Sequence, residues 1–157
     1  MYKVSVQFSK PRKDHFVAKA IRAYQGTPYS HISFSYFSQD FQKDMVIQCT
    51  GNGVNEMPFE LWIKKHELVE VKEKELSMNR YSEILHIASS LLGSKYDWLT
   101  LFLYPVMDYS HIMFGLDDNY SYTCSEFFYE VFRDELGDLG IEPHMVTTKH
   151  IYNALFK

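Results

Sequence analysis

A cysteine stands at the start of a predicted helix in the C-terminal third of the chain. The segment SYTCSEFFYEVF, residues 121–132, places Cys124 directly before apolar residues at helical spacing. The first amides of a helix have no partners within it, and the helix dipole is positive there, so a thiolate is stabilised at this position. The same amides can bind an oxyanion that forms on a carbonyl beside the sulfur. This placement indicates a nucleophilic thiol with a lowered pKa, and the alternative is a small buried residue of the core.

The residues beside this cysteine have a structural explanation. Thr123 and Glu126 lie three positions apart, directly before the apolar run. They predict a capping box, in which the hydroxyl accepts from the third helical amide and the carboxylate accepts from the cap amide. The box does not explain Cys124, because its position, the first of the helix, accepts any residue and favours proline.

A thiol nucleophile also needs a base and a group that orients the base. Among the seven histidines, His31 opens the alternating segment HISFSY and shares one face of the predicted strand with Ser33 and Ser35. A polar face of this kind indicates either a functional surface or a solvated side of the sheet. His66 and His150 lie in polar surroundings, and His86 lies within a helical pattern, so all three have simple structural interpretations.

The next predicted strand, MVIQCT, offers a partner for the imidazole. If the strand register places Gln48 on the His31 face, its amide oxygen would accept the imidazole N–H and fix the tautomer. Cys49 would then point to the opposite face, as a core residue. A register slip of one residue would reverse both orientations.

These side chains need a sheet and several helices to bring them together. Alternating segments predict four strands, at residues 2–8, 31–36, 45–50 and 68–73. Helical spacing predicts helices at 14–24, with Asp14 as its cap, at 80–93, from 94 to a break at Pro105, from 124 onward, and after 148. Residues 107–122 show no clear period. The chain is expected to form a single domain over residues 1–157, of α+β class, with an antiparallel sheet or small barrel-like meander packed against helices.

Composition limits the classes of partner. The formal net charge is −4 and charges of both signs are interspersed, so no nucleic acid is expected as a partner. The segment of mixed charge at residues 64–76 is expected to be a solvated strand edge. No signal peptide and no apolar run long enough for a membrane span is seen, which favours a soluble, cytoplasmic protein; delivery by a phage or effector system stays open. Cys49 and Cys124 are too far apart in sequence for a disulfide framework or a metal knuckle, and no metal or other cofactor is predicted.

Four segments, taken in order, resemble the circularly permuted papain-like hydrolases of the NlpC superfamily. They are YSHISF, VIQCTGNGVNEMPFELWI, GSKYD and YTCSEFFYEVF, at residues 29–34, 46–63, 93–97 and 122–132. This group includes the YiiX/YaeF-like proteins and, more distantly, the lecithin–retinol acyltransferase type. The resemblance extends from residue 29 to the end of the chain and implies a permuted papain-like fold.

The resemblance also implies roles for individual residues. It makes Cys124 the nucleophile and His31 the general base. Gln48 would orient the base, at a position where many relatives have glutamate or histidine. Tyr96 lies in a G-x-x-Y segment whose tyrosine can donate to the oxyanion, and a core or rim aromatic is the alternative for it.

The expected activity is therefore that of a cysteine hydrolase, an amidase or thiol peptidase, acting through an acyl-enzyme on Cys124. A peptide, a peptidoglycan fragment or an acyl compound is the expected substrate, cleaved at an amide, ester or thioester bond. Two alternatives are a non-catalytic binding module on the same fold and an acyltransferase that acts on lipid. A metal site that uses His31 with Cys124 or with the other histidines is disfavoured, because no HExxH or CxxC spacing is present.

Overall fold

One antiparallel sheet forms the centre of the molecule. The computed structural model describes residues 2–110 and 121–156. The strands of the sheet are β1 (Tyr2–Pro11), β2 (His31–Ser38), β3 (Lys43–Thr50), β4 (Gly53–Pro58) and β5 (His66–Leu76). Their order is β4-β3-β2-β1-β5, and every neighbouring pair is antiparallel. Within the described ranges the sheet is open, with β4 and β5 at its edges, so the predicted α+β class is confirmed and the barrel-like variant is not adopted.

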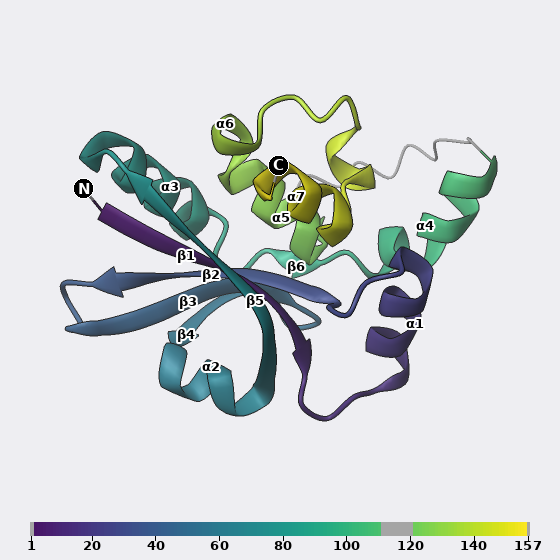
Figure 1. Cartoon of the computed structure of the whole chain (residues 1–157), viewed down its shortest axis with the longest axis horizontal. Helices are drawn as coiled ribbons and strands as arrows, with labels where there is room; N and C mark the ends of the chain where they lie inside the picture. Colours follow the sequence, from purple (N-terminus) through teal and green to yellow (C-terminus); the bar gives the residue numbers. More distant parts are fainter. Residues whose placement is uncertain (1, 111–120, 157) are drawn as a thin grey trace.

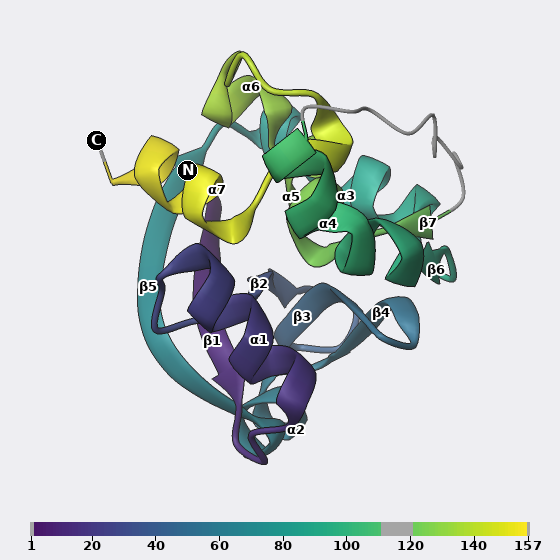
Figure 2. The same cartoon turned by 90° about the vertical axis from the view of Figure 1, so that its right-hand side faces the viewer.

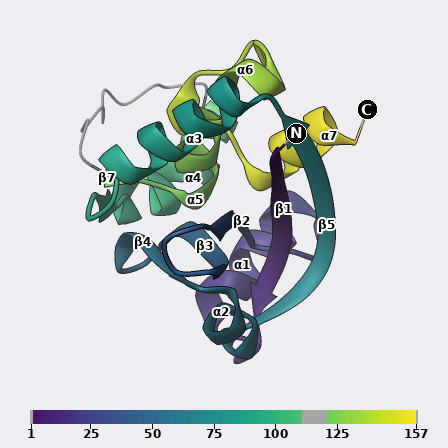
Figure 3. The same cartoon turned by 90° about the vertical axis from the view of Figure 1, so that its left-hand side faces the viewer.

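Helices cover both faces of this sheet, as Figure 1 shows. The helices are α1 (Phe16–Gln25), α2 (Phe59–Lys65), α3 (Met78–Ser90), α4 (Trp98–Ser110), α5 (Cys124–Val131), α6 (Arg133–Leu136) and α7 (Thr148–Leu155), with a short 3-10 helix at Pro143–Met145. The helices α3, α5, α6 and α7 lie on one side, and α2 lies on the other (Figures 1 and 3). Two short parallel strands, β6 (Lys95–Tyr96) and β7 (Ser121–Tyr122), precede α4 and α5.

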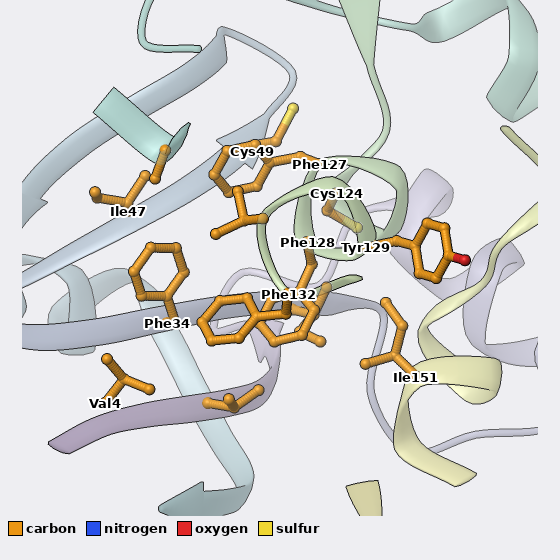
Figure 4. Packing of buried hydrophobic residues seen from close by; sticks show 14 of the residues in the cluster. Val4, Phe34, Ile47, Cys49, Cys124, Phe127, Phe128, Tyr129, Phe132 and Ile151 are labelled. Atoms are coloured by element: carbon orange, nitrogen blue, oxygen red, sulfur yellow. The ribbon is translucent and has the colours of Figure 1, made fainter. Parts of the chain in front are cut away.

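The hydrophobic core lies between the sheet and α5. Phe34 of β2 and Phe132 at the end of α5 are fully buried, with ring centroids 5.0 Å apart (Figure 4). Phe127 and Phe128 of α5 are also fully buried in this core. Truncation of such a ring to alanine typically costs about 3–5 kcal/mol of stability. This packing holds α5 firmly on the sheet and thereby fixes the position of Cys124 at its first turn.

The opposite face of the sheet is polar but is not solvated. Gln7 donates to the hydroxyl of Ser35 at 2.5 Å and accepts from the hydroxyl of Ser33 at 3.2 Å, and all three residues are buried. Trp62 of α2 is fully buried and bonds to Gln48 of β3 on this face. These polar side chains are buried, so the interpretation of the His31 face as a solvated side of the sheet is wrong. Hydrogen bonds between the side chains replace the contacts with water that burial removes.

Several local expectations need correction. The cap of α1 is His15, whose Nδ1 accepts from the amide of Ala18 at 3.4 Å, because the Asp14 carboxylate is held by Arg22 at 2.6 Å. Helix α4 continues through Pro105 and does not break there. Proline removes only one intrahelical hydrogen bond, so the helix can continue on both sides of it.

The strand predicted at residues 68–73 is the centre of β5, which pairs with β1 at the edge of the sheet. The intervening chain forms β4 and α2, which alternation alone did not separate. As expected, β5 is an edge strand with exposed charged residues. Of the segment expected to lack a period, residues 107–110 belong to α4, 121–122 form β7, and 111–120 lie outside the described residues.

Candidate active site

Cys124 is the first residue of α5, and the predicted capping box precedes it. The amide of Glu126 donates to the Thr123 hydroxyl at 3.2 Å, and the Thr123 amide donates to the Glu126 carboxylate at 3.3 Å. The capping expectation for these two residues is therefore confirmed. The capping box fixes the first turn of the helix, and with it the direction of the Cys124 backbone.

A cavity of about 130 Å³ lies at the end of the sheet where β1 and β3 finish and β2 and β5 begin. Three of the four predicted site residues line it: Cys124, His31 and Tyr96. Helix α1 and the start of α4 form its other walls. Trp98 lies against Gly51 so closely that a Cβ atom added to the glycine would be 2.6 Å from the indole ring.

Gln48, the fourth predicted residue, is hydrogen-bonded to His31 but does not line the cavity. Its Oε1 lies 2.9 Å from Nε2 of His31, and the two residues share the polar face of the sheet. Gln48 is directly opposite Ser33 in the register of β2 and β3, which puts it on the His31 face. This is the register under which the orienting role was expected, and Cys49 accordingly faces the α5 side.

Only one orientation of the Gln48 side-chain amide satisfies all of its hydrogen-bond partners. The indole N–H of Trp62 can only donate, and it lies 3.0 Å from the same Gln48 Oε1. At the other end, Gln48 Nε2 donates to Asn55 Oδ1 at 3.2 Å, and Asn55 Nδ2 donates to the carbonyl of Gly53 at 2.9 Å. A carbonyl can only accept, so the donor at one end and the acceptor at the other set both amide orientations.

This network determines the tautomer of His31. Because Gln48 Oε1 is an acceptor, Nε2 of His31 must carry the proton. The lone pair of the neutral ring is then on Nδ1, and no hydrogen bond from the described residues reaches that nitrogen. His31 therefore presents an unprotonated nitrogen, as a general base requires.

The imidazole of His31 is packed in a stack of aromatic rings. His66 lies over His31 with ring centroids 5.2 Å apart, and Trp62 lies over His66 at 4.5 Å. The carbonyl of Trp62 lies 3.1 Å from Nδ1 of His66, so that nitrogen donates to it. The stack keeps the plane of the His31 ring fixed while Gln48 fixes its proton.

Burial keeps both His31 and Cys124 neutral. Desolvation lowers the pKa of His31 to about 3, assisted by the nearby His66 and opposed by the Gln48 hydrogen bond. Desolvation likewise raises the pKa of Cys124 to about 11, although the backbone amides of Ile32, Ser125 and Cys124 itself favour the thiolate. The expectation of a lowered thiol pKa is therefore wrong for this structure: the amides act as expected, but burial outweighs them.

Tyr96 is positioned by the short parallel strand pair of β6 and β7, in which it is opposite Tyr122. Burial raises the pKa of its hydroxyl well above 10, and the thiols of Cys124 and Cys49 are the next causes. The phenol is therefore within electrostatic reach of the Cys124 sulfur and stays protonated, as a hydrogen-bond donor must.

Cys49 is a fully buried core residue, and its thiol donates to the carbonyl of Tyr122 at 3.1 Å. The same carbonyl accepts the amide of Asp97 at 3.0 Å. Burial also raises the pKa of the Cys49 thiol. Cys49 thus helps to hold the strand that leads into Cys124.

Sequence reasoning missed the role of Trp62, Asn55 and His66. Trp62 and Asn55 lie inside one of the four quoted segments, but nothing local indicated that they contact Gln48. His66 was interpreted as a residue in polar surroundings, and its place on the ring stack depends on the tertiary fold. Although His15, His31 and His66 all line the cavity, no set of three ligating side chains in the described ranges is arranged to hold a metal ion.

Comparison with known proteins assigns no family. A scan against protein-family models finds no match, and a search of curated proteins finds no similar sequence. In the part of the chain that the structure describes, no helix is both long enough and apolar enough to cross a membrane.

Proposed function

We propose that this protein is a cysteine hydrolase that cleaves an amide, ester or thioester bond through an acyl-enzyme on Cys124. The observation that carries the proposal is the one-directional network through Gln48, which leaves Nδ1 of His31 unprotonated in a residue that lines the same cavity as Cys124.

The reaction begins from a neutral thiol and a neutral imidazole. As the Cys124 sulfur attacks the substrate carbonyl, its proton passes to Nδ1 of His31, so the attack forms the C–S bond and an imidazolium together. The tetrahedral oxyanion accepts from the backbone amide of Cys124, the first residue of α5, and from the Tyr96 hydroxyl. His31 then returns its proton to the leaving group as the bond to that group breaks.

The second half of the reaction uses the same groups in reverse. Water enters the cavity, His31 Nδ1 accepts one of its protons, and the resulting oxygen attacks the thioester carbon. The C–S bond breaks, the thiolate takes the proton back from His31, and a carboxylic acid leaves. An acceptor alcohol or amine in place of water would make the enzyme an acyltransferase by the same steps.

Gln48 suits a concerted transfer better than a stable ion pair. A neutral amide accepts from Nε2–H in both charge states of His31 but does not neutralise an imidazolium as a carboxylate would. Peptides, peptidoglycan fragments and acyl compounds are the proposed substrate classes.

The direct test is formation of the acyl-enzyme. Incubation with a p-nitrophenyl ester should add one acyl group per chain, and peptide mapping by mass spectrometry should place it on Cys124. Cys124→Ala should abolish both the adduct and turnover while its free energy of unfolding stays within about 1 kcal/mol of the original value. Cys49→Ser, which keeps a donor for the Tyr122 carbonyl, is the matched control and should still be acylated. If Cys124→Ala retains full turnover, the proposal is wrong; if no adduct forms on the unchanged protein, a binding module on this fold is the better description.

A further inference from the structure

A second cavity, of about 180 Å³, adjoins the first and lies between α1 and α4. In Figure 2 both helices lie on the side that faces the viewer. Its walls are mainly apolar and include Val17, Ile21, Leu101, Phe102, Tyr104 and Pro105. The two helices are held together at the far end, where the Tyr24 hydroxyl donates to Asp108 at 2.5 Å.

The two cavities meet at the nucleophile. Cys124, Tyr96 and Ser30 line both of them, together with Val17, Ile21 and Leu101, whereas His31 lines the cavity at the end of the sheet and not the one between α1 and α4. A general acid must be within hydrogen-bond reach of the group that it protonates, so the leaving group has to lie on the His31 side. The acyl part of the substrate then has to lie on the other side of Cys124, in the apolar cavity.

Two residues that line the apolar cavity carry buried hydroxyls without a hydrogen-bond partner among the described residues. The Oγ of Ser30, in a residue only 6% exposed, and the Oη of Tyr104 form no hydrogen bond with any described residue. Ser30 lies at the junction with Cys124, and Tyr104 lies on the α4 wall. Buried polar groups are normally paired, so these hydroxyls indicate a ligand that supplies hydrogen-bonding groups there. A plain hydrocarbon chain would leave both unpaired.

The size of the cavity sets a further limit. An apolar protein cavity of about 150 Å³ is large enough to bind benzene. The cavity beside Cys124, at about 180 Å³, therefore fits an aromatic ring or a branched aliphatic group. Among the described residues that form the walls, none has a charged side chain, so a charged substituent would lose its hydration without compensation from them.

From these observations we infer that the acyl side of the substrate is an apolar aminoacyl group, such as an N-acylated phenylalanine or leucine. Its side chain fills the cavity between α1 and α4, and its amide bonds to Ser30 and Tyr104. The inference rests on the proposed function, because the assignment of the two sides uses His31 as the acid that protonates the leaving group.

A series of p-nitrophenyl esters tests the acyl side. The N-acetyl-phenylalanine and N-acetyl-leucine esters should be turned over with kcat/KM about 10- to 100-fold above that of the N-acetyl-glutamate ester. The dodecanoate ester should be a poor substrate. Preference for dodecanoate or for glutamate would overturn the inference.

Matched variants locate the preference in the structure. Ala20 lines the apolar cavity, and Ala23 is exposed on the same helix and lines neither cavity. Ala20→Phe should lower kcat/KM for the phenylalanine ester about 10-fold by filling the cavity, whereas Ala23→Phe should leave it unchanged. Equal effects of the two variants would overturn the assignment.

A pair of substrates isolates the hydrogen bond to Ser30. The 3-phenylpropanoate ester has the ring of the N-acetyl-phenylalanine ester but lacks its acetamido group. Ser30→Ala should lower kcat/KM for the acetamido ester about 10-fold and leave that for the phenylpropanoate ester unchanged, because only the first offers an amide to the hydroxyl. An equal loss on both esters would show that Ser30 does not bind the amide.

A binding measurement separates this inference from the proposed function. N-acetyl-phenylalaninamide should shift the methyl resonances of Ala20 and Thr148, which line only the cavity between α1 and α4, in Cys124→Ala protein, and the α-amide of N-acetyl-glutamate should not. Binding without Cys124-dependent turnover would contradict the hydrolase while keeping the ligand class of the cavity. Turnover of all the esters at equal rates would keep the hydrolase and contradict the inference.

Discussion

The indole N–H of Trp62 donates to the side-chain oxygen of Gln48 at 3.0 Å, and this contact determines which end of the Gln48 amide faces His31. Trp62 does not touch the cavity, yet it sets the position of the proton on the proposed general base. Residues that act on a reactive group through a second side chain often matter nearly as much as the reactive group itself.

In Trp62→Phe the Gln48 amide should no longer be held in a single orientation. The variant lacks the N–H donor, so either end of the amide can face His31 and both neutral tautomers become populated. We expect kcat/KM to fall about 10-fold and stability to fall by about 1–3 kcal/mol, because the larger indole is fully buried. Nitrogen-15 NMR of His31 measures the tautomer directly. Phe59→Leu, which removes the other ring stacked on Trp62, is the control and should leave the tautomer unchanged.

Gln48→Glu should raise the pKa of His31. A carboxylate beside Nε2 stabilises the imidazolium, typically by 1–3 pKa units, so the pKa should rise from about 3 toward the ordinary range. The new oxygen would also face Asn55 Oδ1, which is fixed because Asn55 Nδ2 donates to Gly53, so stability should fall by about 1–3 kcal/mol.

An NMR titration of the His31 ring measures this shift. Gln39→Glu adds the same charge at an exposed turn and should leave the His31 titration unchanged. A His31 pKa that stays near 3 in Gln48→Glu would mean that the side-chain contact does not control the base.

Acid should destabilise the fold through His31. Its pKa is about 3 in the folded protein and 6.5 in the unfolded chain, so between these values only the unfolded chain binds the proton. The free energy of unfolding should therefore decrease as pH falls from 6.5 to 3, by at most about 1.4 kcal/mol per pH unit from this one group. Above pH 6.5 the contribution is complete and constant.

Urea unfolding across this pH range, for the unchanged protein and for His31→Gln, measures the difference. The variant should show the shallower pH dependence, with a remaining slope that includes His66, whose pKa burial also lowers. Parallel curves for the two proteins would show that His31 is not a buried neutral histidine.

Gly53 should be essential for the loop that supports Tyr96. It has φ +91°, and an added Cβ would lie 2.2 Å from the carbonyl oxygen of Ser94, which accepts the Val54 amide at 2.9 Å. Gly53→Ala combines an unfavourable backbone angle with a backbone clash, so it should cost more than about 2 kcal/mol.

Gly26→Ala provides the control for that substitution. Gly26 also has a positive φ, of 63°, in the left-handed helical region, but nothing lies within 4 Å of an added Cβ. It should cost only the backbone term of about 1–2 kcal/mol, as measured by thermal unfolding. Equal losses in the two variants would mean that the contact with Ser94 contributes nothing.

Local patterns in the sequence predicted the positions of the proposed catalytic groups in the helices and strands, but not their environment. The capping residues Thr123 and Glu126 indicated where α5 begins, and alternation in HISFSY placed His31 at the start of β2. Gln48 could be assigned only on condition of a register, because hairpin pairing depends on contacts beyond a single strand. The structure meets that condition.

The parts that could not be predicted depend on tertiary contacts. Helix α2 has only seven residues and carries no long periodic signal, so its packing on the polar face, and with it the role of Trp62, was not visible. The high pKa of Cys124 arises from burial, which overrides the local effect of the helix start. The cavity between α1 and α4 combines segments that are far apart in sequence, so no local pattern indicated it.

The measurement that tests the central claim most directly is the rate of acylation of Cys124 by N-acetyl-phenylalanine p-nitrophenyl ester, with and without His31. It compares Cys49→Ser protein with the same protein carrying His31→Gln at pH 7, by the burst of p-nitrophenolate and by the mass of the adduct. If His31 accepts the thiol proton during attack, acylation should be about 10²- to 10⁴-fold slower without it. Acylation at the same rate in both proteins would contradict the pairing of Cys124 with His31, and the proposed mechanism with it.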